Sequence, residues 1–200
     1  MHFIAHRRNT LAELSATPVR YGVEVDIRSV GDKLIMHHDP FVEGEPFEDW
    51  IVAYRHGTLI LNVKEEGLEA RLIDLMHKVG IQDYFFLDQS FPFLVKYSNQ
   101  GMRRSAVRVS EFESVQTALA LAGKVGWAWV DCFTRFPLNY VDATNLKEAG
   151  FRLCLVSPEL QGRDAETGIE LLTRQLKDEK IVADAVCTKR PDLWENTYRP

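Results

Sequence analysis

The sequence predicts an α/β fold, a compact (β/α)8 barrel in which eight strands alternate with helices. Three observations support this prediction. Short apolar runs alternate with segments whose apolar residues recur at helical spacing. Several of the runs are continuously apolar, as is typical of parallel strands buried on both faces. Nearly every run ends in a polar or charged residue, and in a barrel these ends share the face that carries active sites.

The first predicted strands surround a compact turn. A strand at residues 3–5 leads to a second at 23–27, and the turn at Gly31 and Asp32 sends the chain into a short apolar run at 34–36. The remaining strands are expected at residues 59–64, 84–87, 105–109, 125–130, 151–156 and 182–187. An open, doubly wound sheet is the structural alternative. It normally has a glycine-rich phosphate loop after its first strand, and residues 6–9 do not form one.

The helices are predicted from apolar spacing and from their end signals. Ser110 and Glu113 have the spacing of a capping box, which predicts a helix that runs up to Ala122. Gly80 and Gly150 follow two other helical patterns and are typical stop residues. The expected helices, apart from the one ending at Ala122, lie at residues 47–51, 68–79, 91–99, 138–149 and 166–177.

Composition predicts one globular domain, residues 1–200. The chain is 46% hydrophobic and 26% charged, and its length can bury a sizeable core. A net charge of −5 argues against a nucleic-acid partner, which favours a basic surface. We expect no membrane span, because the apolar runs are too short, and no signal peptide. Three distant cysteines without a Cys-x-x-Cys pair indicate neither disulfides nor zinc. These features together predict a cytoplasmic protein.

The strongest functional signal lies in residues 3–39. The first strand delivers His6 and Arg7, and the run at 34–36 delivers His38, which an aspartate follows. Glu24 and Asp26 lie on one face of the second strand, because side chains alternate along a strand. Two carboxylates at this spacing lie about 7 Å apart, so their oxygens can converge on one hard cation.

In order and spacing these residues resemble the glycerophosphodiester phosphodiesterase family, whose members are TIM barrels. The family pattern is His-Arg, Glu-x-Asp and then His-Asp, which here reads His6-Arg7, Glu24-Val25-Asp26 and His38-Asp39. The segment 183–193 is similar to the family's closing strand, where an apolar strand ends in a threonine and then a proline. The resemblance covers nearly the whole chain.

The chain departs from the family pattern at several positions. Arg8 stands where the family usually has glycine, and a family segment is compressed to Asn9 and Thr10, so we expect a shortened first helix. The third barrel strand usually offers a metal-binding acid, and here Asn62 takes that place in Asn62-Val63-Lys64. The sequence ends soon after the closing strand, so the last barrel helix is expected to be missing or reduced.

The resemblance implies metal-dependent hydrolysis of a small glycerophosphodiester-like substrate to a phosphomonoester and an alcohol. His6 and His38 would be the acid–base pair, since histidine titrates near neutral pH. The positively charged groups expected to bind the phosphate are Arg7, Lys64 and Arg108. The expected ligands of one divalent cation are Glu24, Asp26 and Asn62. An all-oxygen site suits Mg²⁺ or Ca²⁺.

Several alternatives stay open. The sequence does not decide which histidine is the base, or whether a neighbouring hydroxyl or water attacks phosphorus. Arg108 is as compatible with an ion pair to Asp88 or Asp131 as with substrate binding. A catalytically silent barrel that binds a phosphorylated metabolite is the alternative function, motivated by Asn62 and the shortened first helix. A metal-dependent amidohydrolase would need His-x-His after the first strand, which is absent.

Overall fold

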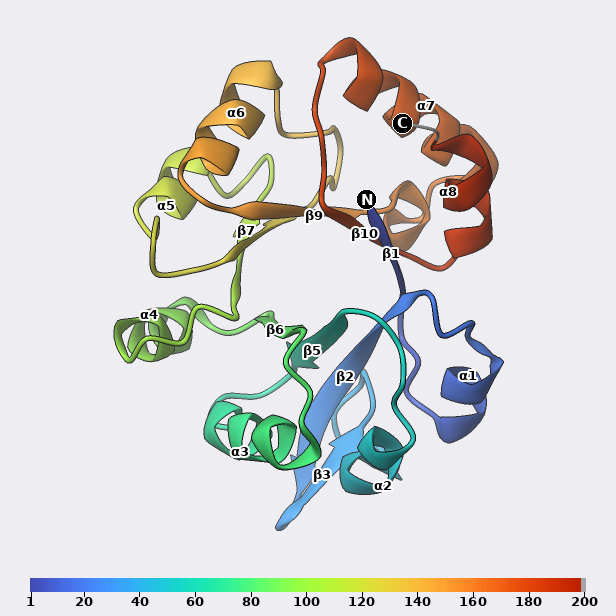
Figure 1. The fold of residues 1–200 in the computed structure, drawn as a ribbon, viewed down its shortest axis with the longest axis vertical. Helices are drawn as coiled ribbons and strands as arrows, with labels where there is room; N and C mark the ends of the chain where they lie inside the picture. The colour runs from blue at the N-terminus through green and yellow to red at the C-terminus, as the bar shows by residue number, and fades with distance from the viewer. Residues whose placement is uncertain (199–200) are drawn as a thin grey trace.

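The structure, a computed structural model, describes residues 1–198 and is a barrel of eight parallel strands (Figure 1). The barrel strands are β1 (His2–Ala5), β2 (Gly22–Val30), β5 (Leu59–Val63), β6 (Tyr84–Leu87), β7 (Ala106–Val109), β8 (Trp127–Val130), β9 (Arg152–Val156) and β10 (Ala185–Thr188). Each pairs in parallel with its neighbours around the barrel. The predicted barrel is confirmed, and the open doubly wound sheet is excluded.

The helices surround the barrel on its outer side (Figure 1). They are α1 (Leu11–Ala16), α2 (Phe47–Val52), α3 (Glu69–Val79), α4 (Phe91–Asn99), α5 (Val115–Leu119), α6 (Tyr140–Glu148), the 3-10 helix η1 (Pro158–Gln161), α7 (Ala165–Asp178) and α8 (Pro191–Thr197). The first and last helices have 6 and 7 residues, so both expected reductions are confirmed. A capping box between Thr10 and Glu13 starts the short first helix.

The helix predicted to start at Ser110 and to run up to Ala122 is shorter at both ends. Helix α5 begins at Val115, where the Ser114 hydroxyl accepts a hydrogen bond from the Thr117 amide. Ser110 and Glu113 bond to each other within the preceding loop, with the Ser110 hydroxyl 2.7 Å from Glu113 Oε2. The spacing of a capping box is therefore present at residues 110–113, but those two residues close a turn rather than start a helix.

A hairpin extends β2 beyond the barrel. The antiparallel strand β3 (Lys33–Met36) pairs with the second half of β2, from Ile27 opposite Met36 to Val30 opposite Lys33. The short strand β4 (Glu45–Pro46) then adds to β3. This hairpin returns the chain to the carboxyl end of the barrel, so the loop after β3 reaches the face where the barrel strands end.

The core has one layer inside the barrel and two clusters outside it. The inner layer includes the stacked rings of Phe85 and Trp127, whose centroids are 4.6 Å apart. One outer cluster lies between β2, β5, β6 and the helices α2 and α3, and the other between β7 to β10 and the helices α5 to α8. Gly22 is required at a close approach, because a Cβ there would lie 2.5 Å from the Thr58 carbonyl oxygen.

The barrel closes through two short seams. Strands β1 and β2 pair at Ile4–Gly22 and Ala5–Val23, whereas β2 and β5 pair at five positions. Within residues 1–198, one isolated bridge, Phe86–Ser105, joins β6 to β7. Figure 1 shows the result, with β2, β5 and β6 in the lower part of the view and β7 to β10 in the upper part. Each part has its own outer cluster, so the barrel consists of two well-paired parts that meet at weaker seams.

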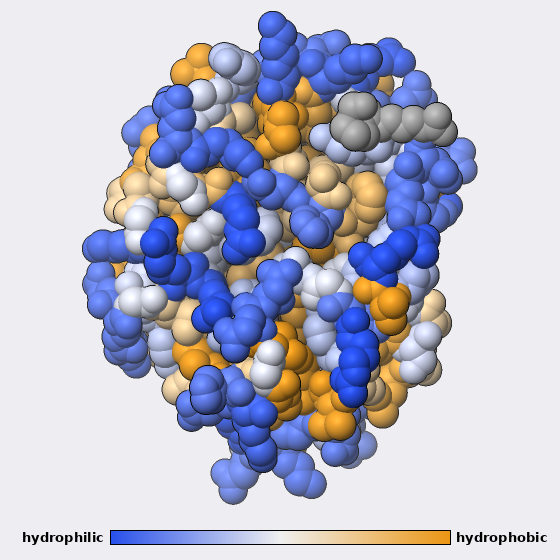
Figure 2. Space-filling model, viewed as in Figure 1, coloured by the Kyte–Doolittle hydropathy of each residue, from blue (hydrophilic) through white to orange (hydrophobic). Residues whose placement is uncertain are grey.

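The predictions about cysteines and membrane spans can be compared with the structure. All three cysteines are buried and free, as expected from their spacing. No helix in the described part of the chain has the length and apolarity needed to cross a bilayer. On the face shown in Figure 2, hydrophobic residues lie in separate patches between hydrophilic ones, which is usual for globular proteins.

Candidate active site

A cavity of about 290 Å³ lies at the carboxyl ends of the barrel strands. It is lined by most of the residues that the sequence singles out: His6, Arg7, Glu24, His38, Asn62, Lys64 and Arg108. Asp26, the remaining candidate, is fully buried and is not among the lining residues. It contacts two of the lining residues, Arg7 and Lys64. Barrel closure thus brings together side chains from β1, β2, β5 and β7 and from the loop after β3. We call this the active-site cavity.

Glu24 is a buried carboxylate at the centre of the group. Its Oε1 accepts a hydrogen bond of 2.8 Å from Asn62 Nδ2, and its Oε2 accepts one of 2.7 Å from the Arg7 backbone amide. The Nε2 atom of His6 lies 3.8 Å from Oε2. Burial, together with the nearby negative charge of Asp26, raises the pKa of Glu24. A cation that reached this carboxylate would relieve both effects.

Asp26 is held by an asparagine that sequence reasoning missed. The Asn9 amide donates to Asp26 Oδ2 at 2.9 Å, and the Asp26 backbone amide donates to Asn9 Oδ1 at 2.9 Å. Two cations contact the same carboxylate: Arg7 Nε lies 3.4 Å from Oδ2 and Lys64 Nζ lies 3.2 Å from Oδ1. The available signal was the position of Asn9, in the loop that directly follows the His-Arg pair. Asp26 therefore fixes both phosphate-binding candidates in position.

The two histidines are in contrasting environments. His6 is mostly buried, with 14% of its side chain exposed. This burial, together with the Arg7 guanidinium, lowers the pKa of His6 to about 3, so its imidazole is neutral near pH 7. Its Nδ1 has no hydrogen-bond partner within residues 1–198. His38 is 42% exposed, and its Nδ1 lies 2.7 Å from Asp39 Oδ1. This hydrogen bond lowers the pKa of Asp39, so the carboxylate stays ionised and holds the His38 ring.

Alternating charges continue across the mouth of the barrel. Lys64 Nζ lies 3.4 Å from Asp88 Oδ2, and Asp88 in turn pairs with Arg108. Arg108 also pairs with Asp131, and its Nε lies 3.8 Å from Glu113 Oε1. Both ion pairs left open by the sequence, with Asp88 and with Asp131, are therefore present. Arg108 lines the cavity, but its charge is already compensated by neighbouring carboxylates.

Two cavity residues have a backbone conformation that favours glycine. Arg7, the second residue after β1, has φ of 52°, and Asp88, directly after β6, has φ of 58°. Such non-glycine residues are uncommon and cost about 1–2 kcal/mol. At Arg7 the cost is offset by the bond from its backbone amide to Glu24. In both cases the turned backbone holds a charged side chain at the edge of the cavity.

A second set of hydrogen-bonded polar residues lies at the ends of β9 and β10, on the opposite side of the barrel mouth. The sequence did not predict this set. Glu159 accepts hydrogen bonds from the Thr188 hydroxyl at 2.6 Å and from the Lys189 amide at 2.9 Å. It also accepts one from the Ser157 hydroxyl, which in turn accepts a bond of 2.8 Å from Trp194 Nε1. These bonds tie the ends of β9 and β10 to α8 and position Lys189, which lines the cavity.

The ligand set for a metal ion is small. No cluster of three or more His, Cys, Asp or Glu side chains suited to a metal occurs in residues 1–198. The oxygen donors that the sequence predicts for a metal are the carboxylates of Glu24 and Asp26 and the amide of Asn62. Asp88 and Asp131 also line the cavity, but Lys64 and Arg108 pair with them. The Asn62 Oδ1 is buried and, in the described part of the chain, has no hydrogen-bond partner. A hard cation would satisfy this atom, so the donors fit Mg²⁺ or Ca²⁺ with fewer charges than a three-carboxylate site.

Three solved structures that resemble this chain are named as glycerophosphodiester or glycerophosphoryl diester phosphodiesterases. A glycerophosphodiester phosphodiesterase from Agrobacterium tumefaciens str. C58 has a TM-score of 0.69 at 14% identity, covering 98% of each chain. A putative glycerophosphoryl diester phosphodiesterase from the same strain has a TM-score of 0.71 at 14% identity, covering 98% of this chain and 96% of that one. A glycerophosphoryl diester phosphodiesterase from Parabacteroides distasonis ATCC 8503 has a TM-score of 0.66 at 14% identity, covering 97% and 85%.

These likenesses establish the fold. The chain is a TIM barrel similar over nearly its full length to glycerophosphodiester phosphodiesterases, as its motifs predicted. No family model matches the sequence, and no curated protein matches it. Since the identity is 14%, any activity has to be argued from the residues of the cavity.

Proposed function

We propose that this chain hydrolyses a phosphodiester of the glycerophosphodiester type to a phosphomonoester and an alcohol, with His6 and His38 as its acid–base pair. The observation that carries the proposal is that both histidines line one cavity together with Arg7 and Lys64. A phosphodiester needs fixed positive charge at its oxygens and proton transfer at its attacking and leaving oxygens. The fold shared with glycerophosphodiester phosphodiesterases supports the same reaction.

The environments of the two histidines favour different roles. His6 is mostly buried and lies beside a guanidinium, so its ring is neutral near pH 7 and has a nitrogen free to accept a proton from the attacking hydroxyl or water. His38 is more exposed, and the carboxylate of Asp39 holds its Nδ1. In the doubly protonated ring, that contact uses the Nδ1 proton and leaves the Nε2 proton for the departing alcohol oxygen, and His38 becomes neutral. We therefore assign His6 as the base and His38 as the acid.

Arg7 and Lys64 are the principal phosphate-binding groups in this proposal. Asp26 holds both cations through contacts of 3.4 and 3.2 Å, and its charge is shared between them. Positions that are fixed before substrate arrives need little reorganisation during the reaction. Arg108 is a weaker candidate, because Asp88 and Asp131 already pair with it. Its role in the proposal is to hold Asp88, and through Asp88 to hold Lys64.

One divalent cation, Mg²⁺ or Ca²⁺, completes the proposed site. Glu24 and Asn62 would hold it, and Asp26 would contribute charge from below. When bound, such a cation supplies positive charge to a phosphoryl oxygen. The same residues also position one another. Glu24 accepts a hydrogen bond from the Arg7 backbone amide, and Asn62 donates one to Glu24.

The proposal is tested on a panel of substrates. Purified protein is assayed on glycerophosphodiesters and on nucleoside-linked and sugar-linked phosphodiesters, each with Mg²⁺, Ca²⁺, Mn²⁺ or EDTA. We expect turnover of at least one glycerophosphodiester, and its loss in EDTA. Turnover that persists in EDTA would overturn the metal part of the proposal. No turnover of any member, together with measurable binding of a phosphomonoester, would favour the catalytically silent barrel.

A further inference from the structure

A second cavity, of about 320 Å³, opens at the seam between β6 and β7. The Phe86–Ser105 bridge, where the Phe86 amide donates to the Arg104 carbonyl at 2.9 Å, is the one ladder contact between these strands within residues 1–198. The strand pairing does not continue from this bridge toward the mouth of the barrel. The wall is therefore open at the level where the active-site cavity lies.

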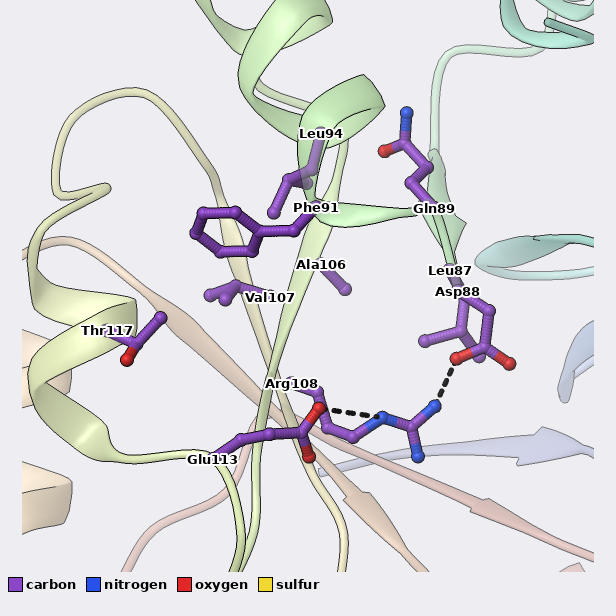
Figure 3. A pocket seen from close by; sticks show the side chains of 10 residues that line it. All are labelled: Leu87, Asp88, Gln89, Phe91, Leu94, Ala106, Val107, Arg108, Glu113 and Thr117. Atoms are coloured by element: carbon purple, nitrogen blue, oxygen red, sulfur yellow. Dashed lines mark hydrogen bonds and ion pairs between the residues drawn. The ribbon is translucent and has the colours of Figure 1, made fainter. Parts of the chain in front are cut away.

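This cavity, which we call the seam pocket, passes through the barrel wall. Leu87 and Ala106 belong to the layer inside the barrel, whereas Leu94 and Val107 belong to the outer cluster, and all four line the pocket. Figure 3 shows Phe91 and Leu94 of α4 facing Ala106 and Val107 of β7. The lining formed by Leu87 and by these residues of α4 and β7 is therefore hydrocarbon, whereas the remaining lining is polar and consists of Asp88, Gln89, Arg108, Glu113 and Thr117.

The seam pocket adjoins the active-site cavity. Leu87, Asp88 and Arg108 line both cavities. At this junction Arg108 pairs with Asp88 and lies 3.8 Å from Glu113, the two contacts drawn in Figure 3. Because these charges compensate one another, the junction offers an occupant polar contacts without an unpaired charge.

We infer that the seam pocket holds the alcohol portion of the substrate, and that it selects a neutral, mainly hydrocarbon group. This inference rests on the proposed function, in which the phosphate lies beside Arg7 and Lys64 in the adjoining cavity. If each non-hydrogen atom takes about the 30 Å³ of a water molecule, the pocket accommodates roughly ten such atoms. A short alkyl chain or a single aromatic ring fits this volume. A cationic amino alcohol would be stabilised by a free carboxylate or by several aromatic faces. Asp88 and Glu113 both contact Arg108 instead, and Phe91 is the single aromatic side chain among the described residues that line the pocket.

The first experiment measures binding without turnover. Methyl phosphate, hexyl phosphate and phosphocholine are titrated into the protein by calorimetry. We expect hexyl phosphate to bind at least tenfold more tightly than methyl phosphate, because burying a methylene group is favourable. Equal affinity for methyl and hexyl phosphate, or tighter binding of phosphocholine than of hexyl phosphate, would overturn the inference.

Two variants of α5 test the location of the site. Thr117 lines the pocket and is exposed, so Thr117→Trp fills the pocket without disturbing the core. It should remove the preference for hexyl phosphate. Gln116→Trp, at the neighbouring exposed position outside the pocket lining, is the matched control and should keep the preference. Phe91→Ala, which removes part of the wall, should weaken hexyl phosphate binding severalfold. A preference that survives both Thr117→Trp and Phe91→Ala would overturn the location.

A measurement of turnover can distinguish a failure of this inference from a failure of the proposed function. Glycerophosphodiesters of methanol and hexanol are compared by kcat/KM. A higher kcat/KM for the hexyl substrate, reduced by Thr117→Trp, supports both ideas. Equal turnover of the two substrates would overturn the seam pocket and leave the hydrolase standing. A preference for hexyl phosphate in binding with no turnover of either diester would overturn the hydrolase and support the pocket.

Discussion

Polar groups on the two sides of the barrel mouth differ in how completely they are hydrogen-bonded. At the ends of β1 and β5, two buried atoms lack a hydrogen-bond partner among the described residues: His6 Nδ1 and Asn62 Oδ1. Beyond β8 and β9, Asp131 accepts from Arg108, Gln161 and the Cys132 amide. Glu159 accepts from Ser157, Thr188 and the Lys189 amide.

This difference separates residues that can act on a ligand from residues that support the fold. A buried polar atom without a partner costs roughly 1–3 kcal/mol, so it persists where a ligand completes it. A carboxylate with all its oxygens occupied stabilises the fold but has little capacity left for substrate. We therefore expect substitutions on the first side to change activity and substitutions on the second side to change stability.

The largest effect is expected at the two histidines. His6→Gln and His38→Gln should each lower turnover by ~10²–10⁴-fold, because each removes one proton-transfer group. Their thermal unfolding should remain close to that of the parent. His37→Gln is the matched control: His37 adjoins His38 in sequence but is not among the cavity-lining residues. Near-parental turnover of either histidine variant in a steady-state assay would remove that residue from the mechanism.

Glu159→Ala should have the opposite signature. It removes the acceptor of three hydrogen bonds and should lower the free energy of unfolding by about 3 kcal/mol. Turnover per folded molecule should change far less than in His6→Gln. Urea unfolding followed by tryptophan fluorescence provides the measurement. Glu170→Ala is the control, since its exposed pair with Arg174 should contribute less than about 1 kcal/mol.

If Glu159→Ala lost turnover as strongly as the histidine variants while keeping its stability, the distinction between the two sides would fail.

Arg7→Lys tests the first side more finely. The charge is kept but the planar fork is lost, so kcat/KM should fall by roughly ten- to a hundredfold. Both kcat and KM should change, because charge on the phosphate rearranges in the transition state. Arg8→Lys serves as the control: Arg8 bonds to Thr17 and to the His6 carbonyl. Identical kinetics for Arg7→Lys and the parent would show that Arg7 is a structural residue at a strand end.

Asn62→Asp should tighten metal binding about tenfold, since each added carboxylate increases the charge offered to the cation. Asn62 now donates to Glu24, so the variant places two carboxylates together and should be less stable without metal. Added Mg²⁺ or Ca²⁺ should restore that stability. Calorimetric titration and thermal unfolding, each with and without metal, provide the two measurements. If the parent binds metal as tightly as the variant, Asn62 is not a ligand.

The smallest effect concerns the free energy of unfolding between pH 4.5 and 6.5. In this window the titrations of Glu24 and His6 change that free energy in opposite directions. The folded-state pKa of Glu24 is raised from 4.5, so its contribution to stability is lost as pH rises. The folded-state pKa of His6 is lowered from 6.5 to about 3, so its contribution is lost as pH falls. Glu24→Gln should therefore make stability rise with pH in this window, and His6→Gln should make it fall.

Urea unfolding across this pH window checks both slopes. Equal slopes for the two variants would show that these buried groups do not control the pH dependence.

Much of the fold could be predicted because its signals are local. Apolar runs mark strands, apolar spacing marks helices, and polar residues at strand ends mark the mouth of a barrel. His6, Glu24 and His38 could be proposed for the same reason, since each lies in or next to a predicted strand. The start of α5 was predicted incorrectly, because a capping-box spacing also occurs in a tight turn.

The sequence by itself determined the pattern of strands and helices. It also determined which residue types are available to bind a phosphate and to transfer protons. Tertiary structure alone decided their partners. Asp26 lies opposite Asn62 because β2 and β5 pair in one register, and Asn9 reaches Asp26 because the loop after β1 turns back over β2. The compensation of Arg108 and the opening between β6 and β7 likewise depend on how distant strands meet. Such contacts join residues far apart in the chain, and local spacing carries no information about them.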